Sequence, residues 1–205
     1  MTVDTHDLEL KLIRRVAGFE LDLLPLQGLW TEEQYLKLTD QTNQLIEFTD
    51  GYLEGLSIPT RSHQRMLACL YQLFAAFLRL HGGEVLFAPL RLQIRPGKQR
   101  EPDMLLLLDE HDPRNQNRFW LGADLVVEIV SADNPERDTV DKVADYAEAR
   151  IPEYWIVNPL NETITVLALA GDVYTTHGVF RRGDRADSPL LAGFAMPVDS
   201  VFDAQ

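Results

Sequence analysis

The chain has 205 residues, of which 45% are hydrophobic, and a formal net charge of −13. This composition suits a packed domain, whereas passive binding to nucleic acid or to an anionic membrane needs a basic face. The single cysteine excludes an internal disulfide and a cysteine-rich zinc site. No apolar run reaches the ~18 residues of a membrane span, and the N-terminus lacks the order of a secretory signal. We therefore expect a cytoplasmic protein without a membrane anchor.

The N-terminal part of the chain predicts an extension followed by a helix and a hairpin. Residues 1–29 mix leucine with charge, and we interpret them as an N-terminal extension with a helix that docks on the body or on a second subunit. Residues 30–205 are predicted to form a single domain. Thr31 and Gln34 have capping-box spacing, which predicts a helix start. Asp50-Gly51 lies between two short alternating runs and predicts a β-hairpin.

The rest of the chain alternates predicted helices and strands. Apolar residues at three- and four-residue steps predict a long helix over 62–81, which ends at Gly82-Gly83. A second helix is predicted over 138–150, and a hairpin over 163–180 that turns at Gly171-Asp172. The tail after this hairpin is too irregular to assign. Strands are predicted over residues 84–90, 90–94, 103–109, 123–131 and 153–157.

This element order predicts an α/β (α+β) fold, with a mixed central sheet flanked by helices. An extra helix and hairpin precede the sheet, and a β-hairpin follows it.

Two acidic residues stand where apolar residues are expected. Glu128 lies inside the apolar run 125–130, and Asp103 follows Pro102 at the start of another apolar strand. A buried carboxylate must be paired, protonated or bound to a metal. If the two strands are neighbours, both carboxylates converge at one end of the sheet. Paired carboxylates without histidine or cysteine partners favour Mg²⁺ or Mn²⁺.

Simpler interpretations exist for each of these residues. Glu128 can face solvent from a strand with one exposed side, and Asp103 can cap a turn after Pro102. Lys142 lies four residues after Asp138, so an ordinary surface ion pair also explains it.

Several ordered strings nevertheless resemble the Uma-type putative restriction endonuclease family of bacteria. They are IEFTDGYLEGLSIPTRSHQRMLACLYQLF, EPDMLLLLDE, ADLVVEIVSADN and DTVDKVADYAEARIPEYWIVNP. The resemblance covers about residues 30–200. It implies a PD-(D/E)xK nuclease fold, which has the element order predicted here.

The resemblance also implies site residues. Pro102-Asp103 matches the PD motif, and Glu128 matches the acid of the second half-motif. The usual lysine two residues later is replaced by Val130, and Lys142 matches the lysine of a D-x-x-x-K motif on the following helix.

Further candidates are implied upstream of these motifs. The hairpin of the family supplies another acid, which is Glu47 or Glu54 here, and the sequence leaves the choice open. His63 and Gln64, at the start of the long helix, are secondary candidates. The main-chain carbonyl of Ile129 is expected to join Asp103 and Glu128 as a metal ligand.

The activity implied is hydrolysis of DNA phosphodiester bonds with Mg²⁺ or Mn²⁺, by a homodimer. Asp103 and Glu128 would hold the metal, and Lys142 would orient a water molecule or neutralise charge on the phosphate. The net charge and the lack of a clear basic groove leave a second hypothesis open, a catalytically inactive nuclease fold that serves as an interaction scaffold. A nuclease that acts on RNA or on structured or single-stranded DNA is a third.

Overall fold

The computed structural model describes residues 11–14 and 19–204. The chain forms two compact units. The N-terminal unit comprises Met1–Ile58 and Pro96–Arg100, and the sheet unit comprises Pro59–Arg95 and Glu101–Gln205.

In the N-terminal unit, the described part of the extension forms strands. Strand β1 (Lys11–Arg14) pairs antiparallel with β2 (Phe19–Asp22), and a short 3-10 helix η1 (Leu24–Leu26) follows. The helix predicted within residues 1–29 is therefore wrong for these segments, and residues 1–10 and 15–18 lie outside the described part. The leucines mixed with charge fit a pleated strand pair as well as a helix face, because pairing with a second strand overrides a weak local preference.

The predicted helix start and hairpin of this unit are confirmed. Helix α1 (Glu32–Thr39) begins with a capping box between Thr31 and Gln34. Strands β3 (Ile46–Thr49) and β4 (Tyr52–Gly55) form the hairpin. Its turn has positive φ at Asp50 and Gly51, 47° and 93°, as a type I′ turn requires. A short strand that the sequence did not predict, β7 (Lys98–Arg100), pairs with β3.

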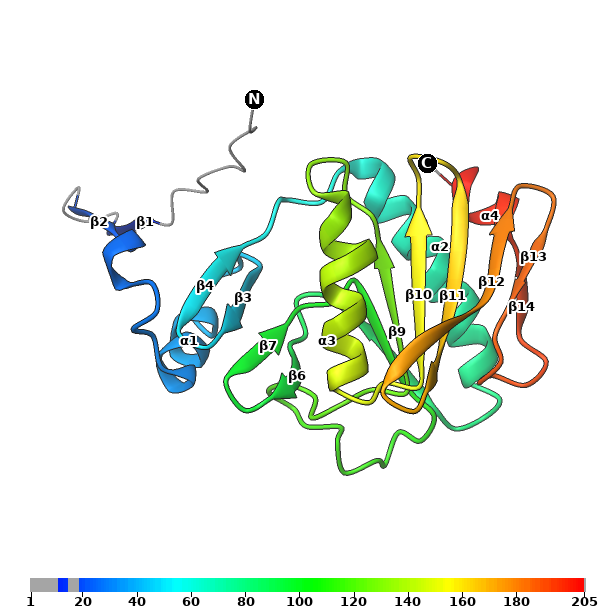
Figure 1. Ribbon diagram of the computed structural model, residues 1–205, viewed down its shortest axis with the longest axis horizontal. Coiled ribbons are helices and arrows are strands. Elements are labelled where there is room, and N and C mark those ends of the chain that lie inside the picture. Colours follow the sequence, from blue (N-terminus) through cyan, green and yellow to red (C-terminus); the bar gives the residue numbers. More distant parts are fainter. Residues whose placement is uncertain (1–10, 15–18, 205) are drawn as a thin grey trace. The chain divides into compact units, whose positions relative to one another are not determined.

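The sheet unit is built on six strands in the order β12-β11-β10-β9-β8-β5 (Figure 1). Within this sheet β9 and β10 run parallel, and the other neighbouring pairs are antiparallel. The mixed sheet predicted from the sequence is thus confirmed. Its strands are β5 (Glu84–Phe87), β8 (Met104–Leu107), β9 (Leu125–Ile129), β10 (Glu153–Asn158), β11 (Thr163–Ala170) and β12 (Val173–Arg181).

Helices cover both faces of this sheet. Helix α2 (Arg61–Leu78) packs on one face, in a core that includes Leu125 and Val127 of β9. Helix α3 (Lys142–Glu148) packs on the other face, in a core that includes Val126 of β9 (Figure 1). Residues of β9 therefore alternate between two cores, which explains why this strand is apolar almost throughout. By the same alternation Glu128 lies on the α3 face.

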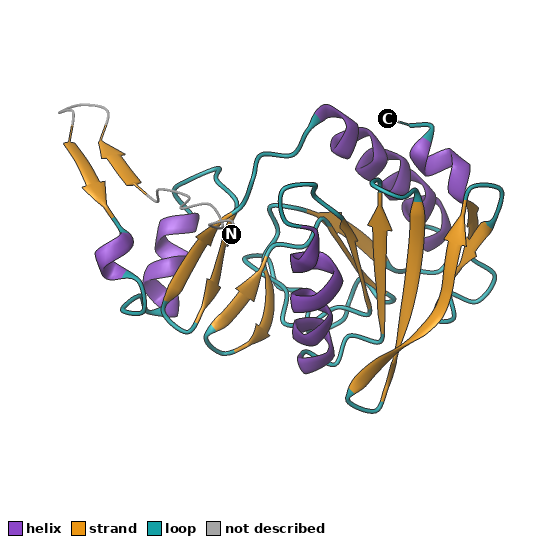
Figure 2. Ribbon diagram, turned by 45° about the horizontal axis from the view of Figure 1, so that its top comes forward, coloured by secondary structure: helices purple, strands orange, loops and turns teal. Residues whose placement is uncertain are grey.

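The C-terminal hairpin is also confirmed, with β11 and β12 joined through Gly171 and Asp172 as one long twisted ribbon (Figure 2). The tail that the sequence left unassigned forms β13 (Arg185–Asp187), β14 (Ala195–Pro197) and helix α4 (Val198–Phe202). Strand β6 (Leu92–Arg95) completes the sheet unit through a bridge between Leu92 and Trp120.

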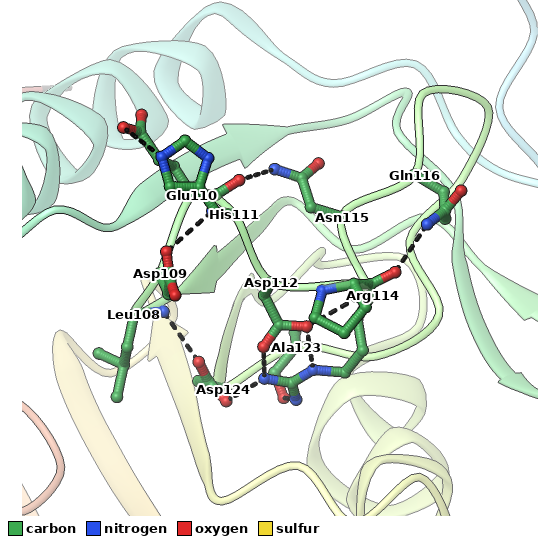
Figure 3. A network of polar contacts seen from close by, with 11 residues as sticks. Leu108, Asp109, Glu110, His111, Asp112, Arg114, Asn115, Gln116, Ala123 and Asp124 are labelled. Carbon is green, nitrogen blue, oxygen red and sulfur yellow. Dashed lines mark hydrogen bonds and ion pairs between the residues drawn. The ribbon is translucent and has the colours of Figure 1, made fainter.

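A long loop joins β8 to β9 and is held by one arginine (Figure 3). The Arg114 guanidinium donates to Asp112 Oδ1 and Oδ2 at 2.9 and 2.7 Å, and to Asp124 Oδ1 at 2.7 Å. Asp124 Oδ2 in turn accepts the main-chain N–H of Leu108 at 2.8 Å. These contacts tie the loop to the ends of the two strands.

Among the described residues, no helix combines the length and apolar character needed to cross a membrane.

Candidate active site

The antiparallel pairing of β8 and β9 brings Asp103 and Glu128 together. Met104 lies opposite Val127, so Asp103, one residue before β8, lies beside Glu128. The main-chain N–H of Asp103 donates to Glu128 Oε2 at 3.3 Å. The main-chain N–H of Ile129 donates to Asp103 Oδ2 at 2.7 Å. The two carboxylates predicted from the sequence are thus adjacent at one end of the sheet.

The side chain of Lys142, the first residue of α3, reaches Glu128. Its Nζ lies 2.8 Å from Glu128 Oε1 and 3.0 Å from Asp138 Oδ1. All three side chains are buried. Asp138 lies in a π-helical turn, Arg137–Asp141, that leads into α3. Such turns occur often at functional sites. The pair between Lys142 and Asp138 is therefore part of the buried cluster, in contrast to the simpler interpretation as a surface ion pair.

A tyrosine that sequence reasoning missed completes the contacts of Glu128. The Tyr146 hydroxyl donates a short hydrogen bond to Glu128 Oε1, the oxygen that also contacts Lys142. Asp138, Lys142 and Tyr146 follow one another at four-residue steps, a spacing that places side chains on one helix face. That spacing is the signal that could have identified Tyr146. With Oε1 engaged by two donors, Oε2 is the oxygen turned toward Asp103.

The first turn of α2 brings His63 to the site from the opposite face of the sheet. His63 Nε2 lies 3.1 Å from Asp103 Oδ2. Burial alone would lower the pKa of His63, but the hydrogen bond and the charge of Asp103 outweigh it, so the pKa is raised. Gln64, the neighbouring candidate, is exposed. Among the described residues, the hydrogen bonds found for Asp103 and Glu128 do not involve Gln64.

The remaining candidates, Glu47 and Glu54, belong to the N-terminal unit. They lie opposite each other in the β3–β4 hairpin. Glu47 is buried, and its Oε2 lies 3.4 Å from Arg100 Nε, whereas Glu54 is exposed. A role for either residue in the site stays a prediction.

The cluster holds three carboxyl groups, those of Asp103, Glu128 and Asp138, around one lysine. Burial raises the pKa of Glu128, Lys142 opposes this effect, and the charges of Asp103 and Asp138 add to it. Burial raises the pKa of Asp138 as well, again against the attraction of Lys142. One lysine therefore does not compensate the buried carboxylates, and a further cation would stabilise their ionised forms.

The donor set fits a hard divalent cation. Both side-chain contacts of Asp103 found among the described residues use Oδ2, so Oδ1 is available as a ligand. No three His, Cys, Asp or Glu side chains of the described chain are grouped as a ready-made metal site. Mg²⁺, however, commonly binds one or two carboxylates and keeps several waters. Asp103, Glu128 and the carbonyl of Ile129 suit such a site, and as ligands they stay a proposal.

Comparisons with known proteins identify the family and the fold of the chain. The model of the family Uma2, described as putative restriction endonuclease, matches residues 32–199. The crystal structure of a putative nuclease belonging to DUF820 from Anabaena variabilis ATCC 29413 has a similar fold, with a TM-score of 0.72 and 17% identity. The match covers 85% of this chain and 98% of that one. No curated protein matches the chain.

Proposed function

The chain belongs to the Uma2 family of putative restriction endonucleases, and we propose that it is a metal-dependent endonuclease that hydrolyses DNA. One observation carries this proposal. Asp103 and Glu128 are adjacent at the end of two paired strands, and Lys142 contacts Glu128 from the next helix. Two carboxylates can hold a metal ion that assists hydrolysis of a phosphodiester, and an ammonium group can stabilise the charge that develops.

In the proposed mechanism, Asp103 and Glu128, with the carbonyl of Ile129, would hold Mg²⁺ or Mn²⁺. When bound, the metal would polarise the phosphodiester and lower the pKa of a water molecule. Lys142 would orient the attacking water or neutralise charge that develops on the phosphate. Tyr146 and His63 would act as positioning residues, because each fixes one carboxylate through a hydrogen bond.

The negative charge of the chain gives the metal a second role. A DNA backbone is repelled by the carboxylate cluster until a cation binds there. We expect DNA binding to depend on the divalent ion for this reason. Cleavage of both strands of a duplex would be achieved most simply by two related sites, so the proposed active form is a homodimer.

The proposal is tested by incubation of the purified protein with supercoiled plasmid at low salt, with Mg²⁺, with Mn²⁺ or with EDTA. We expect cleavage that EDTA abolishes and that Asp103→Asn and Glu128→Gln each reduce by at least about a hundredfold. Asp141→Asn is the matched control, because Asp141 is an exposed acid next to Lys142. This control should cleave like the parent protein.

Cleavage by Asp103→Asn and Glu128→Gln at the parental rate would show that the site is assigned wrongly. Absence of cleavage of plasmid, single-stranded DNA and RNA, together with no calorimetric signal for the metal, would favour the inactive scaffold.

A further inference from the structure

A pocket with two aromatic side chains is lined by residues of α2 and by the last residue of β5. It has a volume of about 270 Å³ and is lined by Gln64, Leu67, Ala68, Tyr71, Gln72 and Phe87. The rings of Tyr71 and Phe87 meet edge to face, with centroids 5.3 Å apart. Phe87 is nevertheless 46% exposed, an unusual position for a phenylalanine at the end of a sheet strand. The pocket therefore offers an aromatic surface to a ligand.

Two residues that line the pocket, Gln64 and Phe87, are each adjacent in sequence to a residue that contacts Asp103. On the helix side, Gln64 follows His63, whose Nε2 lies 3.1 Å from Asp103 Oδ2. On the strand side, Phe87 precedes Ala88, whose main-chain N–H donates to the carbonyl oxygen of Asp103 at 3.2 Å. Phe87 also lies opposite Met104, the residue after Asp103. The lining of the pocket thus adjoins residues that contact Asp103, on the α2 side of the sheet.

The chemistry of the lining suits a nucleobase. Tyr71 and Phe87 provide π faces or edges, on which any base can stack. The exposed carboxamides of Gln64 and Gln72 provide both hydrogen-bond donors and acceptors without charge. The pocket is smaller than the ~300–1,000 Å³ of sites for drug-sized ligands, so its size fits one planar ring system.

We propose that this aromatic pocket binds one unstacked nucleobase of the substrate strand, next to the phosphodiester bond that is cleaved. The inference rests on the proposed nuclease function and narrows its substrate class. A base inside a continuous duplex is covered by its neighbours and cannot enter a pocket. The preferred substrate is therefore a single strand, an unpaired end or a nucleotide flipped out of the duplex.

The first experiment tests the pocket without phosphate, metal or catalysis. Adenosine, an uncharged nucleoside, is titrated into isotope-labelled protein in EDTA and followed by NMR. We expect saturable shifts of the side-chain amides of Gln64 and Gln72. Phe87→Leu keeps the apolar bulk but removes the ring, and should weaken the affinity about tenfold. Phe87→Trp should keep it, as should Leu160→Ala, which alters an exposed apolar residue elsewhere.

The second experiment measures cleavage of a labelled single strand and of the same sequence as a duplex, with Mg²⁺. We expect the parent protein to prefer the single strand, and Phe87→Leu to lower kcat/KM for it about tenfold. Circular dichroism and thermal unfolding check that each variant is folded.

The outcomes separate the two proposals. Binding of adenosine at the pocket without any cleavage would contradict the nuclease function and leave the pocket assignment intact. Cleavage that Phe87→Leu does not change, or adenosine shifts that are absent or map elsewhere, would overturn the pocket proposal alone. A dimer in sedimentation that Phe87→Leu converts to a monomer would also overturn it, because the pocket would then be a contact between copies of the chain.

Discussion

Asp103 and Glu128 fix each other across two paired strands. The N–H of Asp103 donates to the Glu128 carboxylate, and the N–H of Ile129, the residue after Glu128, donates to the Asp103 carboxylate. These reciprocal bonds tie the side chains to the main chain of the sheet. The carboxylates are therefore positioned by the β8–β9 register and are not dependent on a mobile loop.

Removal of the Tyr146 hydroxyl should reduce both stability and activity. Tyr146→Phe deletes the hydrogen bond to Glu128 Oε1 and so removes one of the two donors that orient this carboxylate. We expect a loss of about 1–2 kcal/mol in the free energy of unfolding. We also expect kcat to fall at least about fivefold, because the carboxylate is no longer held in one orientation.

Tyr174→Phe is the matched control for this change. The Tyr174 hydroxyl donates to the carbonyl oxygen of Ile151, in the same core but away from the carboxylates. Denaturant titration and plasmid cleavage should show a similar destabilisation of both variants and a loss of kcat only for Tyr146→Phe. An equal effect on kcat would mean that Tyr146 acts through packing.

Replacement of Lys142 should separate catalysis from metal binding. Lys142→Met removes the ammonium group that contacts Glu128 and Asp138. We expect cleavage to fall about a hundredfold, whereas the affinity for Mg²⁺, measured by calorimetry, should stay the same or increase, because a competing positive charge has left. Lys142→Arg keeps the charge and should retain more activity.

Lys37→Met provides the charge-matched control for this variant. Lys37 also forms an i,i+4 pair, with Glu33, but both side chains are exposed. This change should leave cleavage and metal affinity as they are. Weaker binding of Mg²⁺ by Lys142→Met than by Lys37→Met would contradict the assignment of Lys142 as a competitor for Glu128.

The strands of the central sheet, and the two acids that interrupt or begin their apolar runs, were predictable because their signals are local. A charged residue inside 125–130 breaks an apolar run, and this break identified Glu128. Asp103 was identified in the same way, by its place between a proline and an apolar strand. The hairpin at Asp50-Gly51 was predictable because that turn requires positive φ.

Other features depend on contacts between distant residues. Strand β7 has the sequence KQR, without apolar alternation, and the buried Gln99 donates from its carboxamide to Glu32 Oε1 at 2.8 Å. Tyr146 gave no signal by itself, since an aromatic residue on a helix usually belongs to a core. Its spacing from Asp138 and Lys142 places it on their helix face, and the hydrogen bond from its hydroxyl to Glu128 shows what it does there.

Glu153 shows why burial of an acid does not identify a site. It is as buried as Glu128 and lies on the neighbouring strand β10. Its carboxylate accepts hydrogen bonds from Trp155, from the Ser188 hydroxyl and from the Leu190 N–H. These partners are all donors, whereas Glu128 also faces other carboxylates. The distinguishing feature is therefore that Glu128 lies beside a second acid, and this proximity depends on the pairing of β8 with β9.

The stability of the metal-free protein should fall as pH rises. The pKa values of Glu128, Asp138 and His63 are raised in the folded state, so the folded state binds more protons than the unfolded state. Stability from these groups is present below their unfolded pKa values and is lost as pH rises through the folded ones. Thermal unfolding in EDTA should show a Tm that decreases from about pH 5 to about pH 8.

Mg²⁺ should offset this loss, because it takes the place of protons at the carboxylates. Calorimetry in two buffers of different ionisation enthalpy should detect proton release on binding. Glu128→Gln should flatten the pH dependence of Tm in EDTA. A Tm that rises with pH in EDTA would contradict the charge distribution described for this cluster.

The loop between β8 and β9 should lose stability when its arginine is removed, and the loss should depend on pH. Hydrogen bonds from Arg114 lower the pKa of Asp112 to about 2. This contribution to stability is therefore present above the unfolded pKa of the Asp112 carboxyl and is lost as pH falls through the folded value.

Because these side chains are partly exposed, we expect Arg114→Met to cost only about 1 kcal/mol near neutral pH. Urea titrations should show the difference from the parent shrinking from about pH 5 toward about pH 2, and Arg65→Met, a change of an exposed arginine on α2, should show no such trend. A difference that is constant over this range would place the effect of Arg114 in packing and not in its ion pairs.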